Sequence, residues 1–106
     1  MKRGSIWIVD LSDAKGHEQQ GIRPAVIVGG ANGLTIVVPL TSNMHSARFS
    51  HTHTISPTSG NGLDVDSVVL VFQISALDKY RFKKRIGAIG EPDRLAIAAL
   101  IHDLVD

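Results

Sequence analysis

The chain has 106 residues, of which 43% are hydrophobic and 20% are charged, and its formal net charge is +1. This length fits one domain with a single core, residues 1–106, and the composition is that of an ordinary globular protein. The absence of cysteine excludes disulfides, thiol catalysis and thiolate metal sites. A net charge near zero excludes a uniformly basic nucleic-acid-binding protein but remains compatible with a local basic patch.

Targeting signals are not evident in the sequence. No apolar run approaches the roughly 18–20 residues that span a bilayer. The apolar segment at 5–9 is too short for the core of a signal peptide, and no small-residue cleavage site follows it. We therefore expect a cytoplasmic protein without a membrane partner.

Short apolar and β-branched runs alternate with polar segments along most of the chain, which indicates strands joined by loops. The polar loops are expected at 12–23 and 42–50, and a loop longer than about 10 residues in a compact domain is often functional. Glycine-rich and proline-containing turns are expected at 29–33 and 57–61. The expected strands are 5–11, 24–29, 34–40, 51–55, 67–74 and 85–89.

The last segment, 92–105, reads as a helix. Pro92 suits the first helical position and Asp93 suits the first turn. Apolar residues recur there with a period near 3.6, at Ile97, Ala98, Ile101, Leu104 and Val105. Strands followed by one terminal helix predict a mainly β fold, a small barrel capped by the helix, because alternating strands and helices would be needed for a parallel α/β sheet.

The stretch HEQQGIRPAVIV, residues 17–28, carries the first indication of function. Arg23 stands at the mouth of an apolar strand, directly before Pro24, with hydrogen-bonding side chains upstream. A cation fixed on a rigid element is a candidate anion site. The alternative is a surface arginine that pairs with Glu18 or Asp10.

Several motifs resemble, in order, those of the MazF/PemK family of toxin endoribonucleases. KRGSIWIVDL resembles the family's first strand, GHEQQGIRPAVIV its polar loop running into Arg-Pro, and IVVPLTS its third strand with a functional threonine. Two later segments resemble the remainder of the family pattern. The first, GLDVDSVVLVFQISALDK, resembles its central strand, and the second, KKRIG with the helix that follows, resembles its C-terminal end. The resemblance covers nearly the whole chain, and the combination of GHEQQ-x-x-RP with PLTS is its most specific part.

Membership would imply a MazF/CcdB-like toxin fold, which is an SH3-like β-barrel with a C-terminal α-helix. It would also imply a homodimer, a groove for single-stranded RNA and a cognate antitoxin that occupies this groove. The reaction would be sequence-selective cleavage by 2′-hydroxyl attack, without metal or other cofactor. The gyrase-poisoning toxins with the same barrel lack the loop that leads into Arg-Pro.

The resemblance assigns catalytic roles to Arg23 and Thr41, and His17 and Glu18 join them as candidates because they stand upstream of Arg23 in the same expected loop. A guanidinium can hold two phosphate oxygens, so Arg23 would stabilise the transition state and, in a perturbed environment, donate a proton. Thr41 would donate its hydroxyl to a phosphate oxygen. His17 or Glu18 would accept the 2′-hydroxyl proton, and a flexible loop tip is the alternative for both.

Other polar side chains are candidates for RNA recognition rather than chemistry. Paired amides suit base edges, which makes Gln19 and Gln20 candidates. We add Ser42, His51 and Gln73 to the candidate RNA-binding set. A metal held by His51 and His53 is disfavoured because no third ligand is evident, and two exposed strand histidines are the favoured interpretation.

Two interpretations are open for Trp7 and for the basic segment 79–85. Trp7 alternates with apolar neighbours, which favours core or dimer packing over stacking on a base. Residues 79–85 form a basic cluster that either steers RNA phosphates or is a charged edge strand, and the second interpretation is slightly favoured.

The sequence departs from the family pattern near the end of the central strand. Phe72 stands where many members carry an acidic residue, Leu70 where some carry an arginine, and Ser75-Ala76 where Arg-Thr is usual. Losing a general base typically costs about 10²–10⁴ in rate. The alternative hypothesis is therefore a weak or inactive barrel that binds RNA, antitoxin or another protein without cutting.

Overall fold

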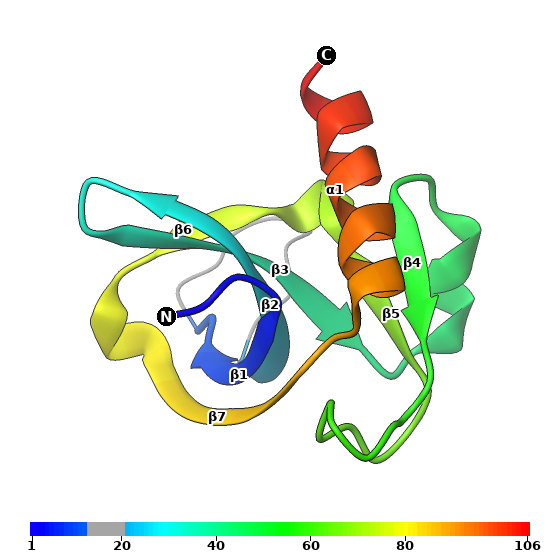
Figure 1. The fold of residues 1–106 in the computed structure, drawn as a ribbon, viewed down its shortest axis with the longest axis horizontal. Coiled ribbons are helices and arrows are strands. Elements are labelled where there is room, and N and C mark those ends of the chain that lie inside the picture. Colours follow the sequence, from blue (N-terminus) through cyan, green and yellow to red (C-terminus); the bar gives the residue numbers. More distant parts are fainter. Residues whose placement is uncertain (13–20) are drawn as a thin grey trace.

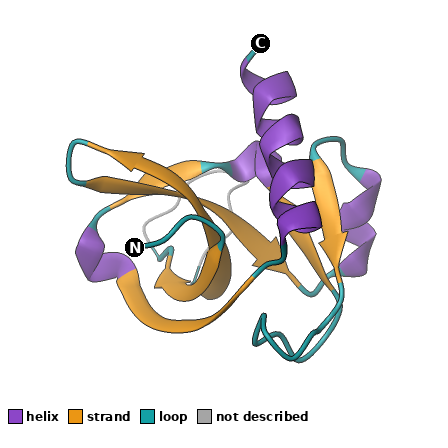
Figure 2. Ribbon diagram, in the orientation of Figure 1, coloured by secondary structure: helices purple, strands orange, loops and turns teal. Residues whose placement is uncertain are grey.

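The computed structural model describes residues 1–12 and 21–106. This part of the chain folds into a curled antiparallel sheet with one long helix against it (Figures 1 and 2). Three short 3₁₀ turns connect consecutive strands: η1 (Met44–Arg48), η2 (Val71–Gln73) and η3 (Lys79–Arg81). The strands are β1 (Ser5–Asp10), β2 (Ile22–Ala31), β3 (Leu34–Thr41), β4 (Thr52–Ile55), β5 (Ser67–Leu70), β6 (Ser75–Leu77) and β7 (Phe82–Ala88), and the helix is α1 (Glu91–Val105).

The sheet has the strand order β4-β5-β3-β2-β1-β7, and β6 also pairs with β3. All pairings are antiparallel, and β2 and β3 form a long hairpin at the centre of the sheet. Among the described residues no pairing joins β4 to β7, so the sheet curls without being closed by hydrogen bonds. The predicted mainly β fold with a C-terminal helix is confirmed.

The run 67–74, expected as one strand, is divided. Its first part is β5, which pairs with the end of β3 through Leu40↔Val69 and Thr41↔Val68. The chain then makes the 3₁₀ turn η2, and β6 pairs farther back along β3. The prediction was wrong here because a continuously apolar run gives no period that marks a corner. Strand β7 was expected at 85–89 but begins three residues earlier, at Phe82.

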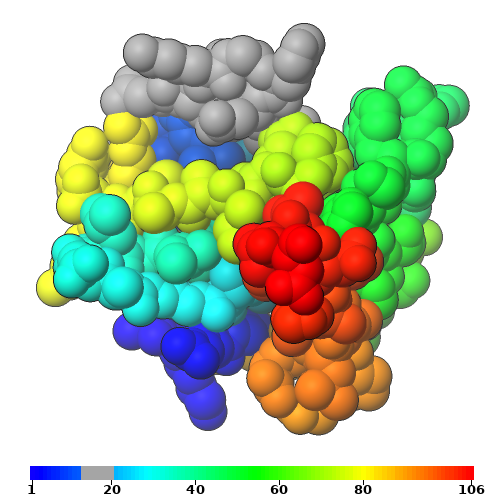
Figure 3. All heavy atoms as spheres, turned by 90° about the horizontal axis from the view of Figure 1, so that it is seen from above, coloured from blue at the N-terminus to red at the C-terminus, as the bar shows by residue number. Residues whose placement is uncertain are grey.

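Helix α1 covers the end of the sheet that β4 and β5 form. Ile97 is its buried residue, and Leu100, Ile101 and Leu104 pack on the same core. Figure 3 looks down on the C-terminal end of α1, which lies between the segment of η1 and β4 and the β2–β3 hairpin. Val105, expected on the apolar face, is instead 71% exposed.

A second cluster fills the curl of the sheet away from the helix. It contains Val9, Leu11, Ala25, Ile27 and Val37. Trp7 packs against this cluster, its ring edge-to-face with Phe82 at 6.0 Å between centroids. Packing rather than base stacking therefore explains Trp7.

No helix in the described part of the chain is long and apolar enough to cross a membrane.

Candidate active site

A hollow of about 310 Å³ brings together three residues that the sequence singled out, Arg23, Thr41 and Ser42. They come from the start of β2, the last residue of β3 and the residue after it. Ile8 and Pro24 line the same hollow, and segment 62–65 and Ile86 complete its wall. Residues separated by eighteen positions in the sequence thus face one space.

Arg23 is positioned by the pairing of β1 with β2. It lies opposite Val9, and the next residue, Pro24, lies opposite Ile8. Its side chain is half-buried. A β-paired backbone fixes the root of the guanidinium, as expected of a cation held on a rigid element.

Thr41 lies opposite Val68 of β5 and is 7% exposed. Its Oγ1 accepts a hydrogen bond from the backbone N–H of Asn43 at 3.2 Å. That bond uses a lone pair of the hydroxyl and leaves its proton available for donation. Ser42, the next residue, is exposed and adds a second hydroxyl to the lining.

The outer wall of the hollow is held by Asn61, which is 2% exposed. Its Nδ2 donates to the Ser56 carbonyl at 3.0 Å, and its Oδ1 accepts from the N–H groups of Thr58 at 3.1 Å and Leu63 at 3.0 Å. The N–H of Ala88 donates to the Gly60 carbonyl at 2.9 Å, which ties this loop to β7. A buried, satisfied side chain thus gives the loop a fixed shape.

Among the described lining residues, Arg23 is the one cation and Asp64 is the one carboxylate. Asp64 is exposed on the wall, and sequence reasoning missed it because a lone acidic residue in a loop carries no pattern. With the hydroxyls, the hollow can bind an anion and exchange protons. No group of three or more His, Cys, Asp or Glu side chains in the described ranges forms a metal site.

Asp10 lies at the end of β1 beside the same strands. Hydrogen bonds from the Ser12 side chain and backbone N–H lower the pKa of Asp10, and the cations of Lys83 and Arg81 lower it further. Asp10 is therefore ionised at neutral pH and its charge is compensated by these neighbours.

Gln73 and His51, also predicted to bind RNA, lie in a different hollow of about 640 Å³. Phe49, Phe72 and Leu104 line it as well. The rings of Phe49 and Phe72 meet edge-to-face at 5.8 Å, so the residue in the family's acidic position contributes apolar surface. This structure does not bring Gln73 and His51 to Arg23.

The interpretation of two exposed strand histidines was wrong. His51 precedes β4 and has a left-handed φ of 57°, and its Nε2 lies 2.8 Å from Asp103 Oδ2. The Nε2 atom of His53 lies 2.8 Å from Asp93 Oδ1. Both imidazoles are half-buried and connect the β4 region to α1. The sequence spacing gave no signal of these partners, since they come from a distant helix.

Four of the predicted residues, His17, Glu18, Gln19 and Gln20, lie outside the described residues. Their catalytic and recognition roles remain predictions. The described part of the site therefore consists of Arg23, Thr41, Ser42 and Asp64.

Comparison with known proteins identifies the family. Residues 2–105 match the family model described as the PemK-like, MazF-like toxin of type II toxin–antitoxin systems. The chain belongs to this family. An endoribonuclease MazF from Staphylococcus saprophyticus is 40% identical over 91 residues, which cover 81% of this chain and 75% of that protein.

Solved structures show the same fold. MazF from Deinococcus radiodurans superposes with a TM-score of 0.81 at 23% identity, covering 99% of this chain and 96% of the other. A mycobacterial endoribonuclease solved in complex with its cognate antitoxin gives a TM-score of 0.71 at 19% identity, covering 97% and 92% of the two chains. The curled sheet and its terminal helix are thus the fold of MazF.

Proposed function

We propose that this chain is the toxin of a toxin–antitoxin pair and an endoribonuclease that cuts single-stranded RNA at selected sequences without a metal ion. The observation that carries the proposal is the shared hollow of Arg23, Thr41 and Ser42. A guanidinium beside two hydroxyls matches the tetrahedral array of oxygens on a phosphate. Family membership and the 40% identity to a MazF endoribonuclease support the same reaction.

In the proposed reaction the 2′-oxygen of the nucleotide before the cut attacks the adjacent phosphorus. A general base takes the 2′-hydroxyl proton, the bond from phosphorus to the 5′-oxygen breaks, and that oxygen takes up a proton. The products are a 2′,3′-cyclic phosphate and a free 5′-hydroxyl. Arg23 binds the non-bridging oxygens as negative charge develops, and Thr41 donates its hydroxyl to one of them. His17 or Glu18 is the proposed base.

We propose RNA, a homodimer and an antitoxin as the macromolecular contacts of the chain, in the cytoplasm. The mycobacterial relative was solved with its cognate antitoxin, and this supports an antitoxin as partner here. Phe49 and Phe72 are 46% and 38% exposed and form apolar surface of the kind that subunit contacts cover. A dimer is expected at micromolar concentration by light scattering, and a monomer would contradict that part of the proposal.

A second candidate function is binding without cleavage. The observation that favours it is the apolar pair of Leu70 and Phe72, which lines a hollow where some members carry an arginine and an acidic residue. Such a protein would retain RNA or antitoxin binding and lack turnover. Cleavage itself decides between the two functions.

The deciding experiment is incubation of the purified protein with a long single-stranded RNA in excess EDTA, followed by mapping of the cut ends. Discrete cuts that leave 5′-hydroxyls are expected, and Arg23→Ala should abolish them without a large loss of thermal stability. Arg48→Ala is the matched control, because this exposed arginine lies 4.7 Å from the Phe49 ring and does not line the hollow. Binding without cuts would establish the second function.

A further inference from the structure

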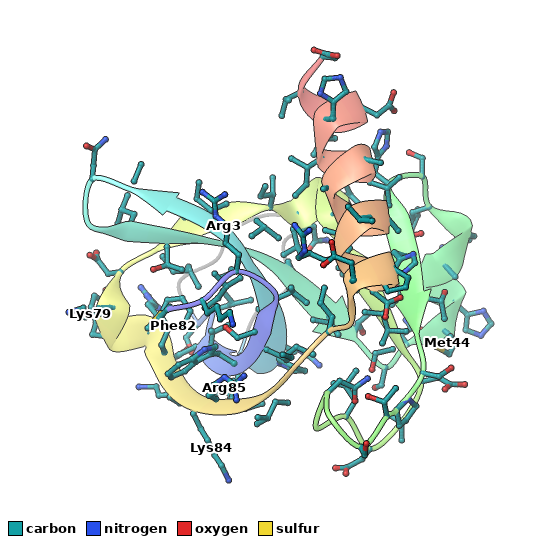
Figure 4. The ribbon with its side chains drawn as sticks, in the orientation of Figure 1. Arg3, Met44, Lys79, Phe82, Lys84 and Arg85 are labelled. Atoms are coloured by element: carbon teal, nitrogen blue, oxygen red, sulfur yellow. The ribbon has the colours of Figure 1, made fainter. Side chains whose placement is uncertain are left out.

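Two apolar side chains stand exposed at the candidate active site. Ile22 is 63% exposed and Val65 is 54% exposed, and both line the hollow that Arg23 also lines. Single exposed apolar residues are ordinary on protein surfaces, as with Met44, which lies on η1 and outside the hollow (Figure 4). Two of them in one hollow, contributed by different elements, have no role in the proposed bond breaking and call for another explanation.

The register of β2 turns Ile22 toward the hollow. Ile22 stands two residues before Pro24, and side chains two residues apart on a strand share a face of the sheet. Pro24 lies opposite Ile8, and both line the hollow, so the hollow lies on this face. The backbone of Ile22 is held by its pairing with Asp10 at the end of β1. A paired strand therefore presents this exposed side chain to the hollow.

Val65 is held on the wall that segment 62–65 forms. The Ser67 hydroxyl, at the start of β5, donates to the Val65 carbonyl at 3.1 Å, and Ser67 is only 4% exposed. The same segment is fixed from its other side, where the Leu63 N–H donates to the Asn61 side chain at 3.0 Å. Val65 thus extends from a backbone that is anchored at both ends.

The chemistry of the hollow suits a whole nucleotide better than a phosphate alone. Arg23, Thr41 and Ser42 offer a phosphate its charge and hydrogen bonds. The aliphatic side chains of Ile22 and Val65 offer it neither. An unpaired RNA base has flat, largely apolar faces, and proteins hold such bases against aromatic or apolar side chains. A volume of about 310 Å³ is at the small end of ligand sites, which fits one nucleotide.

The basic segment 79–85 does not add a second cation to this hollow. None of its residues is among the described lining. Figure 4 shows Lys79 on η3 and Lys84 extending from β7 away from the ribbon. Apolar contact, rather than more positive charge, is what the described residues place beside Arg23.

We propose that Ile22 and Val65 form an apolar slot that binds the base of a nucleotide next to the cut, while the scissile phosphate lies at Arg23. This inference rests on the proposed ribonuclease function. The slot contacts the faces of the base and not its edges, so it favours an unpaired nucleotide without selecting which base it carries. Both residues bind RNA and take no part in bond breaking, so their contribution belongs to affinity and to KM.

The test uses Ile22→Thr and Val65→Ser, with Val105→Ser as the matched control, because this valine is 71% exposed at the end of α1 and does not line the hollow. The binding probe is a single-stranded RNA that spans a mapped cut site, with a 2′-deoxy sugar at the attacking nucleotide so that it stays intact. Further probes lack one base at a time on either side of the cut.

Covering roughly 40 Å² of apolar surface on one side chain strengthens binding about fivefold. We therefore expect about fivefold weaker binding and a similar rise in KM for Ile22→Thr and for Val65→Ser, with kcat within twofold of the wild type. Ile22→Val and Val65→Ile should bind nearly as the wild type does, and Val105→Ser should have no effect. On the probe that lacks the base next to the cut, the difference between the wild type and the slot variants should disappear.

The outcomes separate this inference from the function on which it rests. If the wild-type protein cuts RNA and both slot variants bind the intact probe as the wild type does, the slot is refuted while the ribonuclease stands. A loss that persists on every probe lacking a base also refutes it, because the contact is then not made to a base. Unchanged RNA affinity with weaker dimerisation or antitoxin binding assigns the two residues to a protein interface and refutes it as well. A wild-type protein that does not cut RNA overturns both proposals.

Discussion

Gly62 lies so close to Ile86 that a β-carbon built on the glycine would be 2.1 Å from the Ile86 carbonyl oxygen. Its φ of +72° also lies in the left-handed region that side chains rarely adopt. The contact joins the loop that carries Asp64 to the strand that carries Lys84. The close approach of these two walls of the candidate active site therefore requires a residue without a β-carbon at Gly62.

Gly62→Ala should destabilise the protein and disturb the hollow together. Overpacking of this kind typically costs about 1–3 kcal/mol. We expect a lower denaturant midpoint and a lower kcat/KM for RNA. Gly60→Ala is the matched control, because a β-carbon there meets no atom within 4 Å and the residue lacks a positive φ. Equal midpoints for the two variants would show that the loop adapts to the added methyl.

Arg23→Lys separates charge from geometry at the candidate phosphate site. Lysine keeps the positive charge but lacks the planar pair of donors that can hold two phosphate oxygens. If both donors act in the transition state, kcat should fall by about 10²–10³ while KM changes little. Single-turnover cleavage of a defined RNA measures this directly. A rate within threefold of the wild type would show that Arg23 acts through its positive charge alone and not through its paired donors.

Thr41→Val and Thr41→Ser test the hydroxyl at the end of β3. Valine keeps the shape of the side chain but removes the acceptor of the Asn43 N–H, at a cost of about 1–3 kcal/mol in stability. It also removes the proposed donor to phosphate, so we expect kcat to fall at least tenfold. Serine should restore most of both quantities. Loss of stability in the valine variant with normal kcat would make Thr41 a structural residue.

His53 should stabilise the docking of α1 more than His51 does. The two side chains of the His53–Asp93 pair are 25% and 36% exposed, whereas Asp103, the partner of His51, is 77% exposed. Solvent weakens an exposed pair, so a double-mutant cycle with His53→Gln and Asp93→Asn should give a coupling of about 0.5–1 kcal/mol. The same cycle on His51 and Asp103 should give less, and the reverse order would contradict this assignment.

The sequence predicted the elements whose patterns are local. Strands β1 to β3 were expected nearly where they lie, because β-branched residues, glycine turns and a proline mark their bounds. The expectation that Arg23 and Thr41 belong to one site came from the motif resemblance; both residues line the same hollow, and their catalytic roles remain predictions. In both cases the sequence pattern behind the prediction lies within short runs of consecutive residues.

The features that the sequence did not predict depend on contacts between distant segments. The division of 67–74 into β5 and η2, with β6 following at Ser75, reflects where β3 offers pairing partners, which hydropathy does not encode. The aspartate partners of His51 and His53 lie about fifty and forty residues downstream, on a helix. Asp64 enters the hollow because Asn61 shapes its loop, and no motif marks that arrangement.

Asp64→Asn tests which group is the general base. Asp64 is the carboxylate among the described residues that line the hollow with Arg23, while the proposed bases His17 and Glu18 precede β2 in the sequence and lie outside the described residues. A negative charge beside an RNA phosphate opposes binding, so its removal should lower KM and steepen the salt dependence, with kcat within about threefold of the wild type. If kcat instead falls by the 10²–10⁴ typical of a lost general base, the base is Asp64 rather than His17 or Glu18. Asp66→Asn is the matched control, because this neighbouring exposed aspartate does not line the hollow.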